Sequence, residues 1–318
     1  MVCGLLRTRG SGEKSTMSRG TCAMKNALLF AALLLPTVAL AEDRVANAAA
    51  TAEKPATAEQ AAPPAAKAPV DCKNALGVSR VLEVDTTAGG EYGEQYMHPR
   101  PLLEKGEVVI TFDDGPHPEF TPQILVALAA ECTKATFFYV GRMIKNFPDM
   151  ARQVQAEGHT VGTHTYTHRN LGGTSMGQAE QQIESTFNVA EATLPNGVAP
   201  FFRFPYLSDP QRVRDYLAKR NIAVFGIDVD SFDWRVRTPE KVMHNVFSGL
   251  DKKGGGIILF HDIHANTAKS IPAVLAELKK RSYKVVHLVP KSRLEAVAAA
   301  EPTQVAPRRR AHRHRRAR

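Results

Sequence analysis

The sequence of 318 residues predicts an α/β fold, a distorted (β/α)7-8 barrel formed by a single domain. Two observations favour this fold. Short apolar runs alternate along the chain with longer segments of helical periodicity, which is typical of parallel strands joined by helices. Polar residues with reactive side chains follow several of the apolar runs, as in barrels that carry their active site at the carboxyl ends of the strands.

The alternation covers most of the chain from about residue 107 to residue 289. Runs rich in β-branched and aromatic residues are expected to be strands. The expected strands are 108–112, 135–140, 159–162, 201–204, 222–227, 257–260 and 284–288. The expected helices are 122–130, 149–157, 175–193, 210–220, 239–250 and 268–280.

The amino-terminal segment 1–41 is interpreted as an extension followed by a signal peptide. Met24 is the expected start, because a lysine and a short apolar core follow it, and cleavage is expected after Ala41. The apolar core is too short for a good membrane span. The protein is therefore expected to be exported, to the periplasm or beyond the cell, with no transmembrane segment after cleavage; an uncleaved segment that anchors the protein in the membrane is the alternative.

The formal net charge of +9 belongs to the ends of the chain rather than to its folded part. Residues 42–70, rich in alanine and proline, are expected to be a disordered linker. The domain is placed at 71–298, and 299–318 is expected to be a disordered tail with seven arginines. Envelope polyanions are the expected partners of this tail, and nucleic acid is not, because the chain carries an export signal.

Cys72 and Cys132 are the only cysteines of the expected domain. In an oxidising compartment they are expected to form a disulfide that joins the start of the domain to the first helix. Two separate buried thiols are the alternative.

Two adjacent carboxylates, Asp113 and Asp114, end the first expected strand. Neighbouring side chains of a strand point to opposite faces, so the two can share a site only if the chain turns there. Gly115 and Pro116 supply that turn. One carboxylate is then available to bind a metal and the other to accept a proton, whereas a solvated turn is the alternative.

His164 and His168 lie four residues apart after another expected strand. On one helical turn, two such histidines face the same side and can bind a single ion. Together with Asp114 they form a set of two histidines and one carboxylate, which suits catalytic zinc and other divalent metals. His159 lies outside this turn and is expected to be a packed or hydrogen-bonded strand residue.

Arg203 lies inside an aromatic, apolar run, where an arginine is costly to bury unless it meets an anion. Asp113 is the expected partner, and the ion pair is expected to keep this carboxylate ionised and oriented as a base. A bridge to another acidic loop is the alternative.

His261 is expected at the end of the strand 257–260, where a carboxylate behind it would allow it to act as a general acid toward a leaving amine. Packing in the core is the alternative for His261. Trp234, the only tryptophan of the chain, is either a core residue or part of an aromatic rim for a sugar ring.

These elements, in this order, resemble the motifs of the polysaccharide deacetylase family (carbohydrate esterase family 4, NodB-homology domain). TFDDGP occupies 111–116, HTYTH 164–168, RFPY 203–206, DSFDW 230–234 and LFH 259–261. The resemblance extends from about residue 107 to about residue 289 and implies a single catalytic domain with a barrel fold.

The resemblance implies a catalytic role for each matching residue. Asp113 resembles the general base, and Arg203 resembles the residue that orients it. His261 resembles the general acid. Asp233 resembles the carboxylate that orients this acid, and Asp230 of the same motif is the alternative.

Binding roles are implied in the same way. The backbone N–H of Tyr206 is implied to stabilise an oxyanion, and Trp234 and Leu259 are implied to line the pocket for the acetyl group. Zn2+ is the expected ion, with Co2+ and Ni2+ as alternatives. The implied metal ligands are Asp114, His164 and His168.

The implied activity is metal-dependent hydrolysis of N-acetyl groups from a polysaccharide that contains N-acetylglucosamine, such as chitooligosaccharide, peptidoglycan or an exopolysaccharide, with release of acetate. The alternatives are an O-acetyl esterase of the same fold that acts on xylan or another glycan, and a catalytically idle glycan-binding protein. The complete set of base, ligands and acid argues against the idle protein. Arg235 and Arg237, outside the family motifs, either favour anionic glycans or are solvated loop charges.

Overall fold

The computed structural model of the protein describes residues 71–94 and 102–291, all of which belong to the unit Ala65–Arg318. The expected signal peptide, linker and Arg-rich tail lie outside the described residues, as do the last residues of the expected domain. Within 71–94 and 102–291, no helix has both the length and the apolar character needed to cross a membrane.

All strand pairs in the described part of the chain are parallel, so the predicted α/β fold is confirmed. The pairing runs in the order β8, β9, β3, β4, β5, β6, β7 and β2, while β10 joins β1 to the first residues of β3. The strands are β1 (Arg80–Val84), β2 (Glu91–Tyr92), β3 (Glu107–Asp113), β4 (Thr136–Tyr139), β5 (Thr160–Thr163), β6 (Phe201–Phe202), β7 (Ala223–Phe225), β8 (Val229–Asp230), β9 (Gly256–His261) and β10 (Lys284–Pro290).

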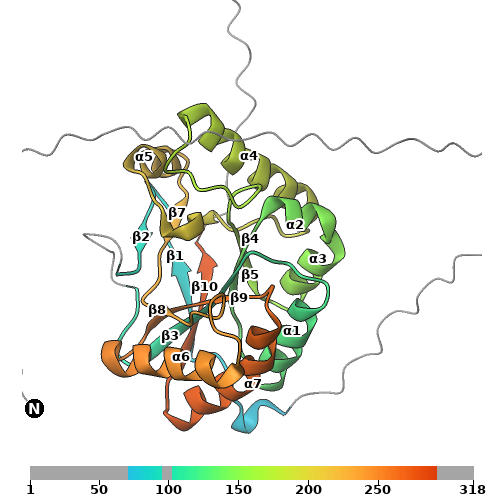
Figure 1. Ribbon diagram of the computed structural model, residues 1–318, viewed down its shortest axis with the longest axis vertical. Coiled ribbons are helices and arrows are strands. Elements are labelled where there is room, and N and C mark those ends of the chain that lie inside the picture. The colour runs from blue at the N-terminus through green and yellow to red at the C-terminus, as the bar shows by residue number, and fades with distance from the viewer. Residues whose placement is uncertain (1–70, 95–101, 292–318) are drawn as a thin grey trace, which may run out of the picture. The chain divides into compact units, whose positions relative to one another are not determined.

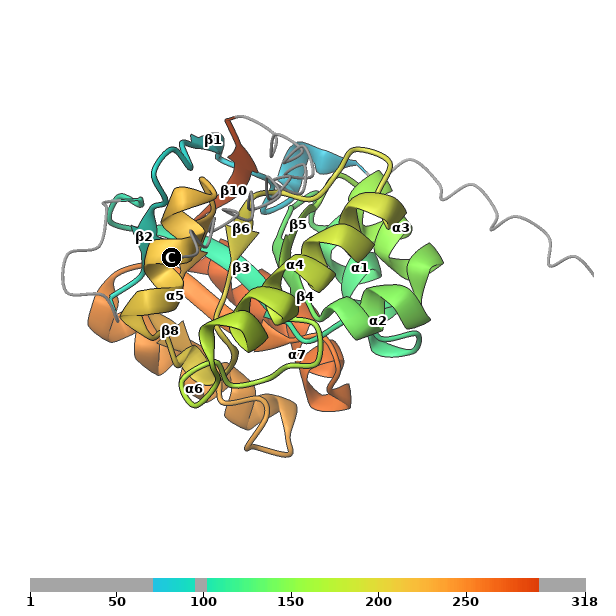
Figure 2. The same ribbon diagram turned by 90° about the horizontal axis from the view of Figure 1, so that it is seen from above.

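The α-helices lie outside the strands in both ribbon views (Figures 1 and 2). Helix α7 packs against both α1 and α6, and α2 packs against both α3 and α4. The helices are α1 (Phe120–Ala130), α2 (Gly141–Asn146), α3 (Pro148–Ala156), α4 (Met176–Thr193), α5 (Gln211–Lys219), α6 (Pro239–Lys253) and α7 (Ala265–Lys280), with 3-10 turns η1 (Cys72–Asn74) and η2 (Pro205–Leu207).

Strand β3 is buried along its whole length because it lies between β9 and β4, with a different set of side chains on each face. Val108, Ile110 and Phe112 belong to the larger apolar cluster, which includes the buried faces of the helices. Val109 belongs to a second cluster, formed mainly by residues from other strands. Because side chains alternate along a strand, Asp113 points to the same face of the sheet as Val109, which is the face turned away from the helices.

The predicted disulfide between Cys72 and Cys132 is present, with the two Cα atoms 5.7 Å apart. It joins η1 to the segment just after α1. The beginning of the described chain is thereby fixed to the outer layer of helices.

Candidate active site

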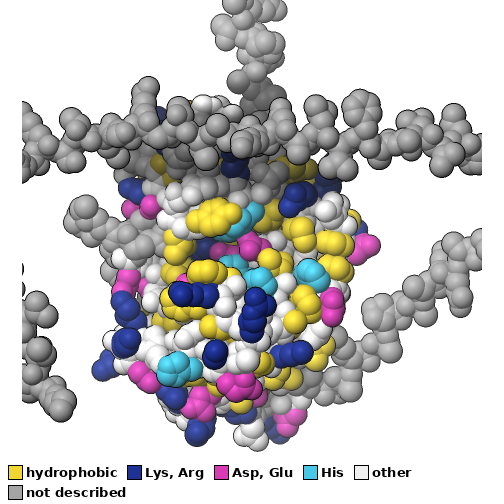
Figure 3. Space-filling view, in the orientation of Figure 1, with side chains coloured by type: hydrophobic (Ala, Val, Ile, Leu, Met, Phe, Trp, Pro, Cys, Tyr) yellow, Lys and Arg dark blue, Asp and Glu magenta, His cyan; other side chains and the backbone are white. Residues whose placement is uncertain are grey.

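Most of the predicted site residues line one cavity of about 430 Å³, at the carboxyl ends of β3, β5, β6 and β9, while Arg203 and Asp233 are buried and contact lining residues. On the face shown in Figure 3, acidic and histidine side chains lie together among hydrophobic ones. Trp234 and Leu259 also line this cavity. The polar lining residues include Asp113, Asp114, His164, His168, Tyr206 and His261.

Arg203 and Asp113 form the buried ion pair that the sequence predicts. The guanidinium Nη1 donates to Asp113 Oδ1 at 2.7 Å and to Thr111 Oγ1 at 2.8 Å. The remaining nitrogens donate to the carbonyls of Phe225 at 3.2 Å and Gly226 at 3.0 Å. Arg203 is fully buried. The carboxylate of Asp113 compensates its charge, and the hydroxyl and carbonyl oxygens of β3, β7 and the segment after β7 accept its other hydrogen bonds.

The pKa of Asp113 is raised, although an ion pair with an arginine would by itself lower it. Burial raises the pKa of this carboxyl, and the opposing charges of Arg203 and His261 do not fully compensate. A carboxylate with a raised pKa is a stronger base. Arg203 binds Oδ1 at 2.7 Å, while Oδ2 lies 3.9 Å from His164 Nε2.

Asp114, His164 and His168 bring three ligand atoms together, all within 4.8 Å of one another. Asp114 Oδ1 lies 3.5 Å from His164 Nε2 and 3.2 Å from His168 Nε2, and it has no hydrogen-bond partner among the described residues. Two atoms each about 2.1 Å from a tetrahedral zinc ion lie about 3.4 Å apart. The spacing and the buried, unpartnered oxygen therefore fit a divalent cation.

The tautomer of His164 also fits metal binding. Its Nδ1 donates to the carbonyl of Arg203 at 2.8 Å, so the lone pair of Nε2 faces the other two ligands. Burial lowers the pKa of His164 to about 3, which keeps the ring neutral.

The prediction that His164 and His168 share a helical turn is wrong. The segment between them is an irregular loop after β5, in which Thr165 and His168 have φ values of 57° and 59°. These left-handed conformations exclude a right-handed helix. The loop nevertheless brings the two imidazoles together, with ring centroids 5.0 Å apart.

His261 is bound to Asp233 rather than to Asp230. Its Nδ1 lies 2.7 Å from Asp233 Oδ1, and its backbone N–H donates to Asp233 Oδ2 at 2.7 Å. Burial lowers the pKa of His261, but the hydrogen bond to Asp233 and the charges of Asp233, Asp114 and Asp113 outweigh it and raise the pKa to about 9. The imidazolium form, a proton donor, is therefore favoured at neutral pH.

Exposed aromatic side chains surround the opening. Tyr206 and Trp234 line the cavity, and their exposed fractions are 68% and 54%. Phe232, 41% exposed, lies beside Trp234 with ring centroids 6.3 Å apart. Tyr206 has a left-handed backbone, with φ 59°. Exposed rings at a cavity mouth are suited to packing against the faces of sugar rings.

Several residues behind the cavity do not belong to any sequence motif that we identified. Thr267 donates to Asp233 Oδ2 at 2.6 Å, and Asn266 donates to the carbonyls of Asp233 and Val236. Asp262 is fully buried, and burial raises its pKa to about 7. Of these three residues, only Asp262 could have been suspected from the sequence, because it directly follows His261.

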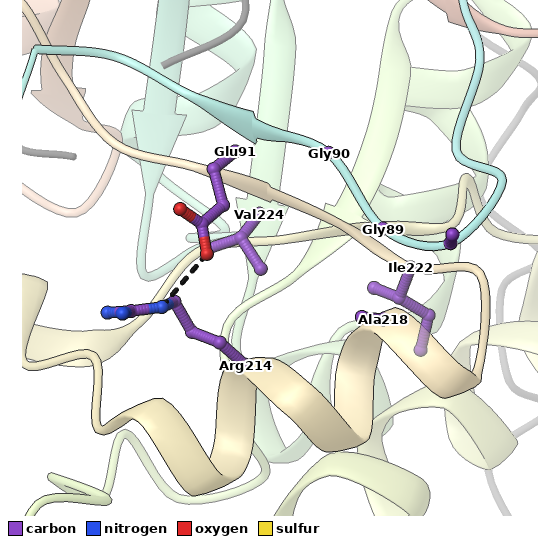
Figure 4. Close-up of a pocket in the computed structure, with 8 residues that line it drawn as sticks. Gly89, Gly90, Glu91, Arg214, Ala218, Ile222 and Val224 are labelled. Atoms are coloured by element: carbon purple, nitrogen blue, oxygen red, sulfur yellow. Dashed lines mark ion pairs between the residues drawn. The ribbon is translucent and has the colours of Figure 1, made fainter. Parts of the chain in front are cut away.

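A second, smaller hollow of about 210 Å³ lies between the loop before β2 and helix α5 (Figure 4). Its charged side chains, Glu91 and Arg214, form an ion pair at 2.9 Å. The other lining residues are glycine, alanine, isoleucine and valine, so this hollow carries no group suited to catalysis.

Comparisons with known proteins identify relatives of this chain. Residues 102–225 match the family model for polysaccharide deacetylase. The chain is 34% identical over 163 residues to a chitooligosaccharide deacetylase of Azorhizobium caulinodans, over 51% of this chain and 77% of the relative. It is 31% identical over 189 residues to a peptidoglycan-N-acetylglucosamine deacetylase of Bacillus cereus, over 58% of this chain and 67% of the relative.

Among solved structures, a peptidoglycan deacetylase of Bdellovibrio bacteriovorus is similar, with a TM-score of 0.61 and 30% sequence identity. The similarity covers 69% of this chain and 61% of the Bdellovibrio chain. The shared part includes a parallel sheet with helices, which agrees with the fold described above.

Proposed function

Because the chain belongs to the polysaccharide deacetylase family, we propose that it is a metal-dependent N-deacetylase of a glycan that contains N-acetylglucosamine. One observation carries the proposal. Asp113 and His261 are register partners on the adjacent strands β3 and β9, and both line the cavity that also contains Asp114, His164 and His168. A base, an acid and a metal site in one cavity are together suited to catalyse the hydrolysis of an amide.

Asp114, His164 and His168 are the proposed metal ligands, with Zn2+ as the first candidate and Co2+ or Ni2+ as alternatives. The bound cation would supply Lewis acidity toward the acetamide carbonyl and toward a water molecule. Metal analysis of the purified protein would identify the bound cation, and assays after removal of the metal would test whether activity requires it.

The protein residues handle the protons. Asp113 accepts a proton from the attacking water, at the oxygen that Arg203 does not hold. His261 donates a proton from Nε2 to the departing nitrogen, because Nδ1 is bound to Asp233. The bond from water oxygen to carbonyl carbon forms first, and the C–N bond then breaks as the nitrogen is protonated, which leaves acetate and a free amine on the sugar. The backbone N–H of Tyr206 is the proposed donor to the carbonyl oxygen as it gains negative charge.

The rim of the cavity bears on the choice of glycan. Arg235 and Arg237 follow Trp234 and are exposed, and neither forms an ion pair with any residue that the structure describes. Their charge favours a glycan with carboxylates, such as peptidoglycan, over neutral chitooligosaccharide. We also propose that residues 24–41 direct export, that the folded domain spans 71–298, and that the Arg-rich tail binds envelope polyanions.

Acetate release from chitooligosaccharide, peptidoglycan and acetylxylan tests the proposal, with metal-loaded wild type and the isosteric variant Asp113→Asn. The expected result is acetate from a glycan that contains N-acetylglucosamine, reduced by at least about 100-fold in the variant. Acetate from acetylxylan alone would favour the O-acetyl esterase. Glycan binding without acetate release, at verified metal content, would favour the idle glycan-binding protein.

A further inference from the structure

A buried carboxylate lies directly behind the turn that carries the base and one metal ligand. Asp262 follows His261 at the end of β9, is fully buried and does not line the cavity. Its backbone N–H donates to the carbonyl of Asp113 at 3.3 Å. Asp262 therefore contacts the turn 113–116 from outside the cavity.

The contacts of Asp262 connect three parts of the fold. Its Oδ2 accepts hydrogen bonds from Thr121 Oγ1 of α1, at 2.6 Å, and from Tyr139 Oη of β4, at 3.2 Å. The backbone carbonyl of Tyr139 in turn accepts the N–H of His164 at 2.9 Å. The same tyrosine thus holds Asp262 with its side chain and a proposed metal ligand with its backbone.

The remaining oxygen, Oδ1, is directed at Gly115. It has no hydrogen-bond partner of good geometry among the described groups. A Cβ atom added at Gly115 would lie 2.2 Å from Oδ1, and its three nearest atoms would all belong to Asp262. The φ of Gly115 is not in the left-handed region, so this position requires glycine for space rather than for backbone conformation.

The turn itself needs support. Asp114 has φ 77°, a left-handed conformation that costs free energy in a residue with a side chain and persists only when its surroundings hold it. In this conformation its carboxylate faces His164 and His168. The carbonyl of Phe138 accepts the N–H of Asp114 at 3.2 Å, and the carboxylate of Asp262, packed against the next residue of the turn, is a second polar group placed to hold it.

We infer that Asp262 is a positioning residue for the metal site: anchored by Thr121 and Tyr139, it packs against Gly115 and fixes the turn 113–116, so that Asp114 faces the two histidines. The inference rests on the proposed metal site. A positioning group of this kind acts on metal affinity, and outer-sphere partners of metal ligands typically change affinity by about 10- to 100-fold.

Metal affinity of the full chain, measured for Zn2+ by competition with a chromophoric chelator, tests the inference without reference to activity. Asp262→Ala is expected to weaken Zn2+ binding about 10- to 100-fold. Gly115→Ala is expected to do the same, because its Cβ would displace the carboxylate. The double variant Gly115→Ala/Asp262→Ala is expected to lose much less than the product of the two single effects, because the new methyl group then occupies the vacated space.

Glu107→Gln is the matched control. Glu107 is also a buried carboxylate, but it lies at the opposite end of β3, where it pairs with Arg80 at 2.7 Å. The control is expected to lower the melting temperature with no change in Zn2+ affinity. Gly115→Ala, which leaves residue 262 unchanged, provides the test if Asp262→Ala does not fold, and Asp262→Asn, which keeps the shape and an acceptor oxygen, is expected to retain most of the affinity. The Co2+ absorption spectrum of each variant reports whether the ligand geometry is altered.

The outcomes separate the inference from the proposed function. Wild-type affinity in Asp262→Ala or in Gly115→Ala, or fully multiplicative effects in the double variant, would overturn the inference and leave the proposed function intact. A wild-type protein that binds no divalent metal would overturn both.

Discussion

Asp233→Asn is expected to leave His261 mostly unprotonated at neutral and alkaline pH, so that it can no longer serve as a proton donor. In the structure, Asp233 binds His261 through both carboxylate oxygens, at 2.7 Å each. Burial lowers the pKa of His261, and the hydrogen bond and charge of Asp233 are the main effects that raise it to about 9. An asparagine has nearly the same shape but no charge, so the effect of burial is expected to dominate.

The size of the effect follows from the two pKa values. With Asp233 the pKa of His261 is about 9, and without the charge it is expected at or below the ordinary 6.5. This difference corresponds to roughly 3 kcal/mol in favour of the imidazolium. At pH 7.5, the protonated fraction would fall from roughly 97% to roughly 10% or less.

The activity of the proposed deacetylase requires protonated His261, so it is present below the pKa of this group and is lost as pH rises through it. In Asp233→Asn the loss should begin at least about two pH units lower. The kcat/KM for acetate release should fall about tenfold or more at pH 7.5, and much less at pH 5.5, relative to wild type at the same pH. The measurement is kcat/KM from pH 5 to pH 10.

Asp230→Asn is the matched control, because Asp230 belongs to the same motif and lines the cavity but does not bind His261. It is expected to move the alkaline limb by much less. An alkaline limb that stays in place in Asp233→Asn, or that moves equally in Asp230→Asn, would refute the reasoning.

Three further predictions concern metal and stability. His168→Ala removes one proposed ligand and should weaken Zn2+ binding by more than about 100-fold in a chelator competition; retained affinity would exclude His168 as a ligand. Arg203→Met leaves Asp113 buried without its cation and should lower the free energy of unfolding in urea by about 3–5 kcal/mol at pH 8. The loss should be smaller at pH 4, because protonation of Asp113, whose pKa is raised, removes the unpaired charge, and an equal loss at both pH values would contradict this. Cys72→Ser removes a disulfide between residues 60 apart and should lower the free energy of unfolding by about 3–4 kcal/mol in the same assay. An unchanged free energy of unfolding in wild type after chemical reduction would contradict this.

The fold was predictable where strands are long, apolar and followed by helices. Strands β3 and β9 carry continuous buried runs, and both were located to within about one residue. Strand β1 (Arg80–Val84) was missed because its exposed residues alternate with partly buried ones. Strands β2 and β8 were missed because each has only two residues, one of them acidic, whereas the equally short β6 consists of two phenylalanines. Tertiary pairing, rather than local pattern, makes these segments strands.

The candidate site was predictable where reactive residues end strands. Asp113 and His261 come directly from such positions, and the parallel sheet brings them together. The loop conformation of His164 and His168 was not predictable, because no glycine marks the left-handed positions. Asp262 was missed for another reason: its partners Thr121 and Tyr139 are 141 and 123 residues away in sequence and meet it only in the folded chain.

The register of β3 and β9 limits which sequence changes the site can tolerate during evolution. Asp113 and His261 occupy paired positions on neighbouring strands, so their backbones are separated by the spacing of the sheet, about 4.8 Å. No surface loop sets this separation. Loops such as 232–237 can therefore lengthen, shorten or change charge from one descendant to the next while the proposed base and acid keep their places. A single inserted or deleted residue inside either strand would instead turn one of these two side chains to the other face of the sheet and abolish the proposed reaction. Changes of length and charge are thus tolerated in the loops at the cavity, whereas insertions and deletions in β3 and β9 are not.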